Sequence, residues 1–305
     1  MAKNELTTHA GFAALLGAPN AGKSTLLNQL VGEKLSIVSP KAQTTRMRVL
    51  GLLTEGDTQI GLIDTPGIFE PKGRMDKAMV QAAWHSLEDA DAILLLVDAA
   101  TRQPDARTDA IIATLQKQKR RVTLVFNKID KVKATKLLPM TDRLNETGVF
   151  DEIFMVSALT GDGVAELKQH LRGKMPKGPW MFPEDQLTDL TERLLAAEIT
   201  REQIFRQLHE ELPYAATVRP DSWEEKRDGS VIIRQTILVN RPNHRAIVLG
   251  KNGAQIKALG AAARQELAES LGHPVHLFLE VKVDENWQDK PDFYHLFGLE
   301  PGSRK

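Results

Sequence analysis

The fold of the first half of the chain is decided by the stretch Gly17-Ala18-Pro19-Asn20-Ala21-Gly22-Lys23-Ser24-Thr25. An apolar run at 12–16 precedes it and leucines at helical spacing follow it, so the sequence predicts a glycine-rich loop between a buried strand and an amphipathic helix. In that context backbone N–H groups can surround phosphate oxygens at the positive end of the helix dipole. We therefore expect all nine residues to contact a nucleotide, with Lys23 on the β- and γ-phosphates and the Ser24 hydroxyl on Mg²⁺.

A second polar cluster, Asp64-Thr65-Pro66-Gly67, follows the short apolar strand predicted at 58–63. This strand delivers Asp64 to the sheet edge where open α/β folds bind their ligands. Asp64 is predicted to hold Mg²⁺ directly or through a water molecule, and Gly67 offers a backbone N–H to the γ-phosphate. On its own the segment would be read as a Pro-Gly turn.

Two further clusters predict the base site: Asn127-Lys128-Ile129-Asp130 and Ser157-Ala158-Leu159, each just past an apolar strand. The Asp130 carboxylate can accept from the N1–H and 2-amino groups of guanine, and a site built on buried hydrogen bonds rejects the wrong base by roughly 10⁴ to 10⁵. Lys128 is expected to pack over the ring, and the Ala158 N–H to donate to guanine O6. Together the four clusters predict a phosphate-loop domain that binds GTP and GDP with Mg²⁺.

The residue that follows Gly67 is important for catalysis. Many GTPases place a glutamine there or nearby to orient the attacking water, but this chain has Ile68. An aliphatic side chain cannot polarise water, so we expect slow intrinsic hydrolysis in which Lys23, Gly67 and another group assist.

Length and composition agree with two buried cores. The chain has 305 residues, 42% of them hydrophobic, a formal net charge of zero and no cysteine. Disulfides and thiolate metal sites are thereby excluded, and the predicted location is cytoplasmic. No apolar stretch has the length of a membrane span, and the first residues lack the apolar core of a signal peptide.

A stretch rich in proline and glycine at 173–183 separates the two halves. We expect a GTPase domain at 1–175, a linker at 176–187 and a second domain at 188–305. The strands expected in the first domain alternate with helices, and they lie at about 12–16, 49–54, 58–63, 92–97, 122–126 and 153–156. The alternation predicts a mostly parallel α/β sheet, with one hairpin turning at 55–57.

The second half predicts a small α+β module. A long helix at 188–211 precedes strands near 215–224 and 231–240, and a further strand follows at 275–283. The stretch 231–265 contains basic residues but no Asp or Glu. Such a tract within a neutral chain favours an anionic partner.

Within that tract, Gly250-Lys251-Asn252-Gly253 joins two predicted helices. A turn of this kind lets a nucleic-acid backbone approach closely, as in KH modules, although alone it would be read as a helix cap. RNA is the expected partner and DNA is not. The candidate RNA-binding residues are Ile247, Gly250, Lys251, Asn252, Gly253 and Lys257.

With both motif sets, the linker and the length considered together, the chain resembles the Era family of bacterial GTPases from end to end. The resemblance implies a Ras-like P-loop GTPase domain followed by a type II KH domain. The segment Ala42-Gln43-Thr44-Thr45-Arg46 matches that family's first switch, which implies that Thr45, or its neighbour Thr44, closes over Mg²⁺ and the γ-phosphate. Asn20 fits a phosphate-loop pattern in which this asparagine helps to hold K⁺; otherwise it stabilises the loop.

The resemblance also implies a biological role. It points to binding of the 3′ end of small-subunit ribosomal RNA, maturation of the small ribosomal subunit, and peripheral association with the inner membrane. The alternative is a GTPase switch with a membrane or cell-cycle role in which RNA binding is secondary.

Overall fold

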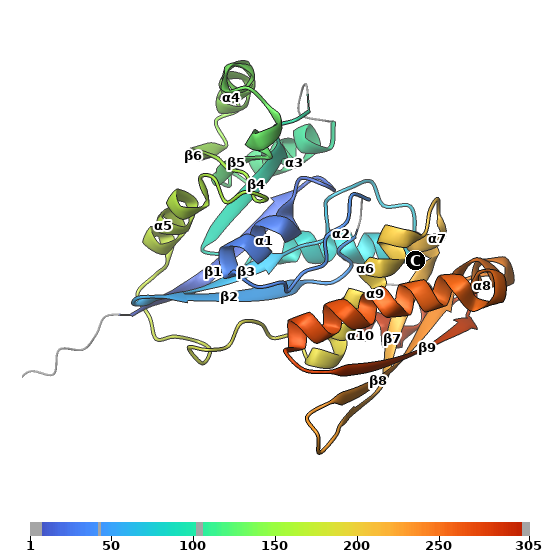
Figure 1. Cartoon of the computed structure of the whole chain (residues 1–305). Helices are drawn as coiled ribbons and strands as arrows, with labels where there is room; N and C mark the ends of the chain where they lie inside the picture. Colours follow the sequence, from blue (N-terminus) through green and yellow to red (C-terminus); the bar gives the residue numbers. More distant parts are fainter. Residues whose placement is uncertain (1–7, 42–43, 102–105, 301–305) are drawn as a thin grey trace, which may run out of the picture. The chain divides into compact units, whose positions relative to one another are not determined.

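The computed structural model describes residues 8–41, 44–101 and 106–300, and its contacts divide the chain into two units (Figure 1). The first unit contains the described parts of Met1–Ser36, Thr45–Asp189 and Phe297–Lys305. The second contains Leu190–Leu296 together with the described part of Ile37–Thr44, which lies between two elements of the first unit in the sequence. Each unit is described by itself below.

The first unit is built on a six-stranded sheet in the order β2-β3-β1-β4-β5-β6. Only β2 runs antiparallel to its neighbour. The strands are β1 (His9–Gly17), β2 (Val49–Glu55), β3 (Thr58–Asp64), β4 (Ala92–Asp98), β5 (Val122–Asn127) and β6 (Phe150–Met155). The helices are α1 (Lys23–Val31), α2 (Arg74–His85), α3 (Ala106–Lys117), α4 (Leu137–Asn145) and α5 (Val164–Lys174).

The strand order explains where the functional clusters gather. Strand β1 lies between β3 and β4 and is parallel to both, so chain connections leave β1 toward opposite sides of the sheet. Ligands of open α/β sheets bind at such a switch point, at the carboxyl ends of the strands. Gly17, Asp64 and Asn127 are the last residues of β1, β3 and β5. The sheet therefore brings the predicted phosphate, metal and base clusters to one edge.

The connecting segment after α5 is held against the first unit. Gln59 accepts from the backbone N–H groups of Met181 and Phe182, and the Leu52 N–H donates to the Leu187 carbonyl at 2.8 Å. The Thr188 hydroxyl donates to the carbonyl of Leu50 at 2.7 Å. The bonds at Leu52 and Leu50 use backbone groups of the edge strand β2, which would otherwise remain unpaired.

The second unit contains a three-stranded sheet in the order β7-β8-β9, with β7 and β8 antiparallel and β8 and β9 parallel. Its elements are α6 (Glu192–Gln207), α7 (Leu212–Ala215), β7 (Ala216–Glu225), β8 (Val231–Val239), α8 (Pro242–Leu249), the 3₁₀ turn η3 (Lys251–Gly253), α9 (Ala254–Leu271), β9 (Val275–Val283), the 3₁₀ turn η4 (Trp287–Asp289) and α10 (Pro291–Leu296). Alternate residues of β8, such as Ile237 and Val239, are buried together with Ile204 of α6 and Leu259 of α9. The helices thus cover one face of this sheet.

The predicted architecture is confirmed: a mostly parallel α/β sheet with one antiparallel edge strand precedes a smaller α+β unit. The helix expected at 188–211 is shorter, because α6 ends at Gln207 and Glu210 takes a left-handed conformation with φ 54°. Helices α4 and α10 were not predicted. Among the described residues, no helix has both the length and the apolar character needed to span a bilayer.

Candidate functional site

The phosphate loop leads directly into helix α1. Gly22 caps the helix at φ 96°, and a Cβ placed there would lie 2.1 Å from the Asn127 amide nitrogen, so only glycine fits. The Lys23 ammonium donates to the carbonyls of Gly17 and Ala18, both at 3.1 Å. Burial lowers the pKa of Lys23 to about 8, although the nearby Asp64 carboxylate opposes this shift. The loop therefore holds a buried cation beneath backbone groups that can face phosphate.

Beside this lysine, oxygen atoms gather around Asp64. The Ser24 hydroxyl donates to Asp64 Oδ2 at 2.6 Å and lies 2.9 Å from the Thr45 hydroxyl, and Ser36 donates to the same Oδ2 at 2.8 Å. Burial raises the pKa of Asp64, while Lys23 and these hydroxyl groups lower it. The other oxygen, Oδ1, is buried with no hydrogen-bond partner. An unpartnered carboxylate oxygen among hydroxyl groups fits the ligand preference of Mg²⁺.

The two threonines of the predicted switch segment have different surroundings. The Thr45 hydroxyl is in the cluster with Ser24, whereas the Thr44 hydroxyl donates to the Lys41 carbonyl at 2.9 Å and contacts Ser39. Thr45 is therefore the one next to the candidate metal ligands in this structure. Two residues of the predicted segment, 42 and 43, lie outside the described residues.

The Asp64–Gly67 segment packs under the phosphate loop. A Cβ at Gly67 would lie 2.9 Å from the Pro19 backbone, so residue 67 lies against the loop and has no room for a side chain. Thr65 is used structurally, since its hydroxyl donates to the Leu15 carbonyl at 2.8 Å. The Ile68 N–H donates to the Gly17 carbonyl at 3.2 Å, and the Ile68 side chain is buried in the apolar core. Ile68 therefore offers no polar group to a water molecule.

The base-side clusters are joined to the phosphate loop by Asn127 and Lys128. The Asn127 amide donates to the Ala21 carbonyl at 2.9 Å, and its oxygen accepts from the Ala158 N–H at 3.0 Å. That N–H, which was predicted to meet guanine O6, is therefore engaged by Asn127 in this structure. The Lys128 ammonium donates to the Asn20 carbonyl and to Asp98, both at 2.6 Å. Sequence reasoning missed Asp98, although it ends strand β4 at the same sheet edge.

Asp130, the predicted reader of guanine, is held by one hydrogen bond from the other cluster. The Ser157 hydroxyl donates to Asp130 Oδ1 at 2.7 Å. Asp130 itself is exposed, and Leu159 is exposed over 73% of its surface. One carboxylate oxygen is thus positioned by the protein while the other is free to accept from a ligand. Asn20 is also exposed and has a left-handed backbone at φ 66°.

The candidate nucleic-acid loop connects α8 to α9 through η3. Gly250 has φ 70°, and a Cβ there would lie 2.7 Å from the Gln255 side chain. Lys251 and Asn252 are exposed at the turn. Ile247 on α8 is 53% exposed, and Lys257 is exposed one turn into α9. The N–H groups of Gly250 and Gly253 donate within the turn, to the carbonyls of Ala246 and Gly250. The loop therefore presents polar and cationic side chains to solvent, beside an exposed aliphatic residue.

The basic tract is not a uniform basic surface. Arg234 of β8 alternates with the buried Ile233 and Gln235, and so faces away from the helices. Its guanidinium lies 3.2 Å from Glu224 of the neighbouring strand and 5.3 Å from the ring centre of Phe278. Cross-strand pairing thus offsets one of the charges that the linear sequence leaves unopposed.

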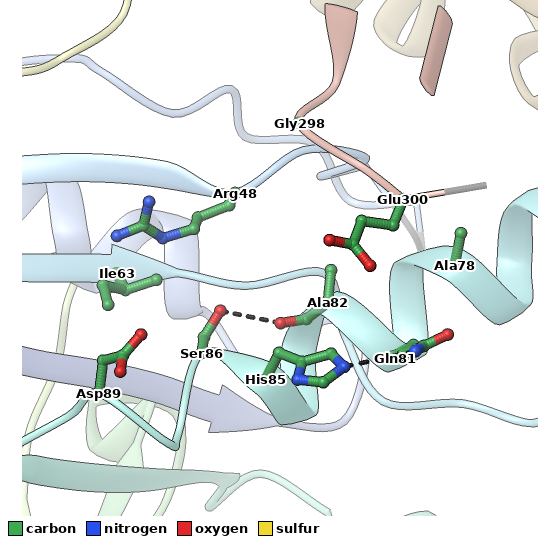
Figure 2. A pocket seen from close by; sticks show the side chains of 10 residues that line it. All are labelled: Arg48, Ile63, Ala78, Gln81, Ala82, His85, Ser86, Asp89, Gly298 and Glu300. Atoms are coloured by element: carbon green, nitrogen blue, oxygen red, sulfur yellow. Dashed lines mark hydrogen bonds between the residues drawn. The ribbon is translucent and has the colours of Figure 1, made fainter. Parts of the chain in front are cut away.

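A second kind of metal site was looked for among the side chains that most often bind metals. Among the described residues, no group of three or more His, Cys, Asp or Glu side chains is arranged to hold a metal ion. A separate cavity of about 310 Å³ lies beside α2 in the first unit, and Figure 2 shows Ser86 and His85 bonding back to Ala82 and Gln81 of that helix. Its lining includes one arginine, Arg48, and two acidic residues, Asp89 and Glu300. Because the lining carries charges of both signs, it selects neither anionic nor cationic ligands.

Comparisons with known proteins agree with this geometry. Residues 12–128 match the 50S ribosome-binding GTPase family, and residues 211–288 match the KH domain family. GTPase Era of Afipia carboxidovorans is 55% identical over 96% of this chain and 95% of its own length. The corresponding protein of Bradyrhizobium diazoefficiens is 53% identical over the same shares.

Two similar solved structures contain nucleotides. Era in complex with MgGDPNP and nucleotides 1506–1542 of 16S ribosomal RNA has a TM-score of 0.90 and 42% identity, covering 95% of this chain and 99% of that chain. Era from Aquifex aeolicus, solved as a variant bound to GDP and AlF₄⁻, has a TM-score of 0.89 with the same identity and coverage. From the motifs, the fold and this full-length identity, the chain belongs to the Era family of GTPases, and it pairs a GTP-hydrolysing domain with a KH domain.

Proposed function

We propose that this GTPase binds the single-stranded 3′ end of small-subunit ribosomal RNA and acts in the maturation of the small ribosomal subunit. The observation that carries the proposal is the likeness to Era solved with MgGDPNP and nucleotides 1506–1542 of 16S ribosomal RNA, which extends over 95% of this chain. The exposed turn at Lys251 and Asn252 supplies a surface of the right chemistry, since it combines a lysine and a side-chain amide with flanking glycines that allow a nucleic-acid backbone to approach.

For the nucleotide, we assign the phosphates to the loop at 17–25 and to Gly67, and the guanine edge to Asp130. Mg²⁺, when bound, supplies positive charge to the β- and γ-phosphate oxygens. Ser24, Asp64 and Thr45 are the residues that would hold it, in agreement with the unpartnered Oδ1 of Asp64. Lys23 stabilises the charge that develops on the phosphates, because its ammonium is buried at the loop.

For turnover, we propose that Asn20 helps to hold K⁺ at the phosphates. The proposal is supported by the buried Ile68, which leaves the position after Gly67 without a polar side chain. A monovalent cation would then supply charge where other GTPases use an arginine. Asn20 is exposed on the loop, and its carbonyl is already engaged by Lys128.

For RNA, we propose that Gly250 and Gly253 allow close approach of the backbone, and that Lys251 and Lys257 contact phosphates. Asn252 adds a polar group at the turn, and Ile247 offers an apolar contact to a base. The test is the affinity of the wild-type protein and a Lys251→Asp, Asn252→Asp variant for a labelled RNA with the 3′-terminal sequence of small-subunit ribosomal RNA. We expect binding to weaken at least tenfold, with a salt dependence flatter by about 0.7 for the lost lysine contact.

A matched control is available at the end of α3. Lys117 and Gln118 are exposed, and their replacement by aspartates makes the same change in charge in the first unit. That variant should bind the RNA as wild type does. Equal RNA affinity in the two variants would overturn the assignment of the loop.

The domain limits and the location are separate proposals. We propose a GTPase domain at 1–175, a linker at 176–187 and a KH domain at 188–305. We also propose a cytoplasmic location, because a chain without cysteine does not depend on disulfide bonds, which rarely form in that compartment. Peripheral association with the inner membrane rests on the family resemblance. Flotation with anionic vesicles tests it, and recovery of the protein only in the unbound fraction would contradict it.

A further inference from the structure

The adjacent ends of β4 and β5 bring two charged side chains together within the first unit. Asp98, the last residue of β4, is the partner of Asn127 in the parallel register. The Ala99 N–H donates to the Asn127 carbonyl at 2.8 Å, which extends the pairing one residue beyond β4. Lys128 follows with a left-handed backbone at φ 67°, and its N–H donates to the side-chain oxygen of Asn127 at 2.8 Å. The sheet therefore fixes the backbone from which the side chains of Asp98 and Lys128 extend.

The Asp98 carboxylate is oriented by its own turn. Its Oδ1 accepts from the Ala100 N–H at 2.8 Å, and its backbone carbonyl accepts from the Thr101 hydroxyl at 2.8 Å. An aspartate that bonds to the backbone two residues further on closes a turn with its own side chain and loses rotational freedom. Its Oδ2 lies 2.6 Å from the Lys128 ammonium. One oxygen of Asp98 thus holds the turn, and the other holds the lysine.

The Lys128 ammonium has a second partner in the phosphate loop, because it also donates to the Asn20 carbonyl at 2.6 Å. A Cβ added to Gly22 would lie 3.9 Å from Lys128 Cε, so the stem of the lysine lies close to the loop. A lysine side chain is flexible, and a ligand that has to immobilise it loses affinity. Two fixed oxygen atoms, one on Asp98 and one on Asn20, immobilise this lysine without a ligand.

We propose that Asp98 is a positioning residue for guanine-nucleotide binding: it holds the Lys128 ammonium against the phosphate loop, so that the stem of Lys128 is already in place to pack over the base. The inference rests on the proposed binding of guanine nucleotides, with Lys128 packed over the ring. Asp98 acts through Lys128 and is not assigned a contact with the nucleotide.

The test is a double-mutant cycle on Asp98 and Lys128. Asp98→Asn keeps an oxygen that can accept from the Ala100 N–H, but it replaces the charged acceptor of Lys128 with an amide group that cannot accept. Lys128→Met removes the ammonium and keeps an unbranched stem. The two single variants and the double variant are assayed without RNA. The measured quantities are the affinities for GDP and for a non-hydrolysable GTP analogue, and the single-turnover rate of hydrolysis at saturating GTP.

A matched control is available in the same unit. Asp109 pairs with Arg143 at 3.0 Å, and these two side chains are 47% and 46% exposed, compared with 23% for Asp98 and 26% for Lys128. Asp109→Asn therefore makes the same change in charge and breaks an ion pair that lies away from the site. Exposed ion pairs contribute little, so this variant should match the wild type in every assay.

We expect Asp98→Asn to weaken the binding of GDP and of the GTP analogue about equally, by about tenfold, the size of one charge-assisted hydrogen bond. The single-turnover rate should stay within about twofold, because the base is the same in the ground state and in the transition state. In the Lys128→Met background, Asp98→Asn should change both affinities by less than about twofold, since the group through which it acts is gone.

Two results would overturn the inference. One is wild-type affinity for both nucleotides in Asp98→Asn. The other is an equal loss of affinity from Asp98→Asn with and without Lys128, which would show that Asp98 acts on the fold independently of the lysine. Lys128→Met alone separates this inference from the assigned site. If Lys128→Met binds GDP as the wild type does, the packing of Lys128 over the base fails, whereas if it binds weakly and Asp98→Asn binds normally, only the positioning role fails.

Discussion

The Ser157 hydroxyl donates a 2.7 Å hydrogen bond to Oδ1 of Asp130 and so joins the two clusters assigned to the base. This leaves Asp130 Oδ2 for the guanine donors. Replacing Asp130 with Asn should lower GTP affinity by about 100-fold and improve xanthosine triphosphate binding, because an amide can donate to the xanthine oxygen. Ser157→Ala should cost GTP affinity only about fivefold, because Asp130 is exposed and water can replace the lost hydroxyl group. Competition titrations measure both, and wild-type ATP binding within tenfold of GTP would contradict the assignment.

The second prediction concerns the cation. Because Ile68 is buried in the core, hydrolysis should be slow in Na⁺ and should rise when K⁺ replaces it at the same ionic strength. Asn20→Ala should lose most of that rise while keeping GDP affinity. Phosphate release in the two salts is the measurement. Equal wild-type rates in Na⁺ and K⁺ would exclude the role of K⁺ and leave Asn20 as a loop-stabilising residue.

Substitutions at two glycines should distinguish the effect of backbone strain from the effect of a steric clash. Gly22 and Gly32 both have left-handed conformations, at φ 96° and φ 89°, but of the two only Gly22 has a neighbour, Asn127, within 4 Å of the position that a Cβ would occupy. Gly32→Ala should destabilise the fold by about 1 kcal/mol and leave nucleotide binding unchanged. Gly22→Ala should abolish GTP binding, because the clash displaces Asn127 and the loop together. Titration of a fluorescent GDP derivative, with unfolding temperatures as reference, tests this difference.

Acid stability should depend on His170. Burial lowers the pKa of His170, and the Lys174 charge adds to the shift, while Glu152 and Asp151 oppose it. The folded state therefore binds fewer protons than the unfolded state below about pH 6.5, so stability is lost as the pH falls through this range. His170→Gln should show a smaller fall in unfolding temperature between pH 7.5 and pH 5.5 than the wild type does. A similar change in the exposed His209→Gln variant would contradict this assignment.

The sequence predicts much of this fold because local patterns carry it. Apolar runs of four to seven residues ended by polar clusters indicate parallel strands, and parallel strands bring their carboxyl ends to one sheet edge. Asp64 and Asn127 could be placed beside the phosphate loop on that argument alone. The same reasoning located the turn at Gly250, since a glycine pair between two helical patterns indicates a tight connection.

Other features could not be predicted because their partners are distant in the sequence. Arg201 and Thr44 are 157 positions apart, and no periodicity in either segment indicates their contact. The hydrogen bond from Ser36 to Asp64 depends on the path of a loop whose sequence has no regular pattern. Arg234 belongs to a stretch without acidic residues, yet Glu224 of the neighbouring strand pairs with it. Neutralisation of surface charge depends on such tertiary pairs, so the linear charge pattern overestimates how basic this surface is.

The most direct test of the account is GTP hydrolysis measured with and without the 3′-terminal ribosomal RNA fragment, for the wild type and for the Lys251→Asp, Asn252→Asp variant. The account predicts that the RNA raises the wild-type rate, and that the variant keeps the basal rate and GTP affinity but loses the stimulation, since the altered loop belongs to the KH domain. Equal stimulation of both proteins, or none in the wild type despite tight RNA binding, would contradict the claim that RNA binding at the KH domain stimulates GTP hydrolysis.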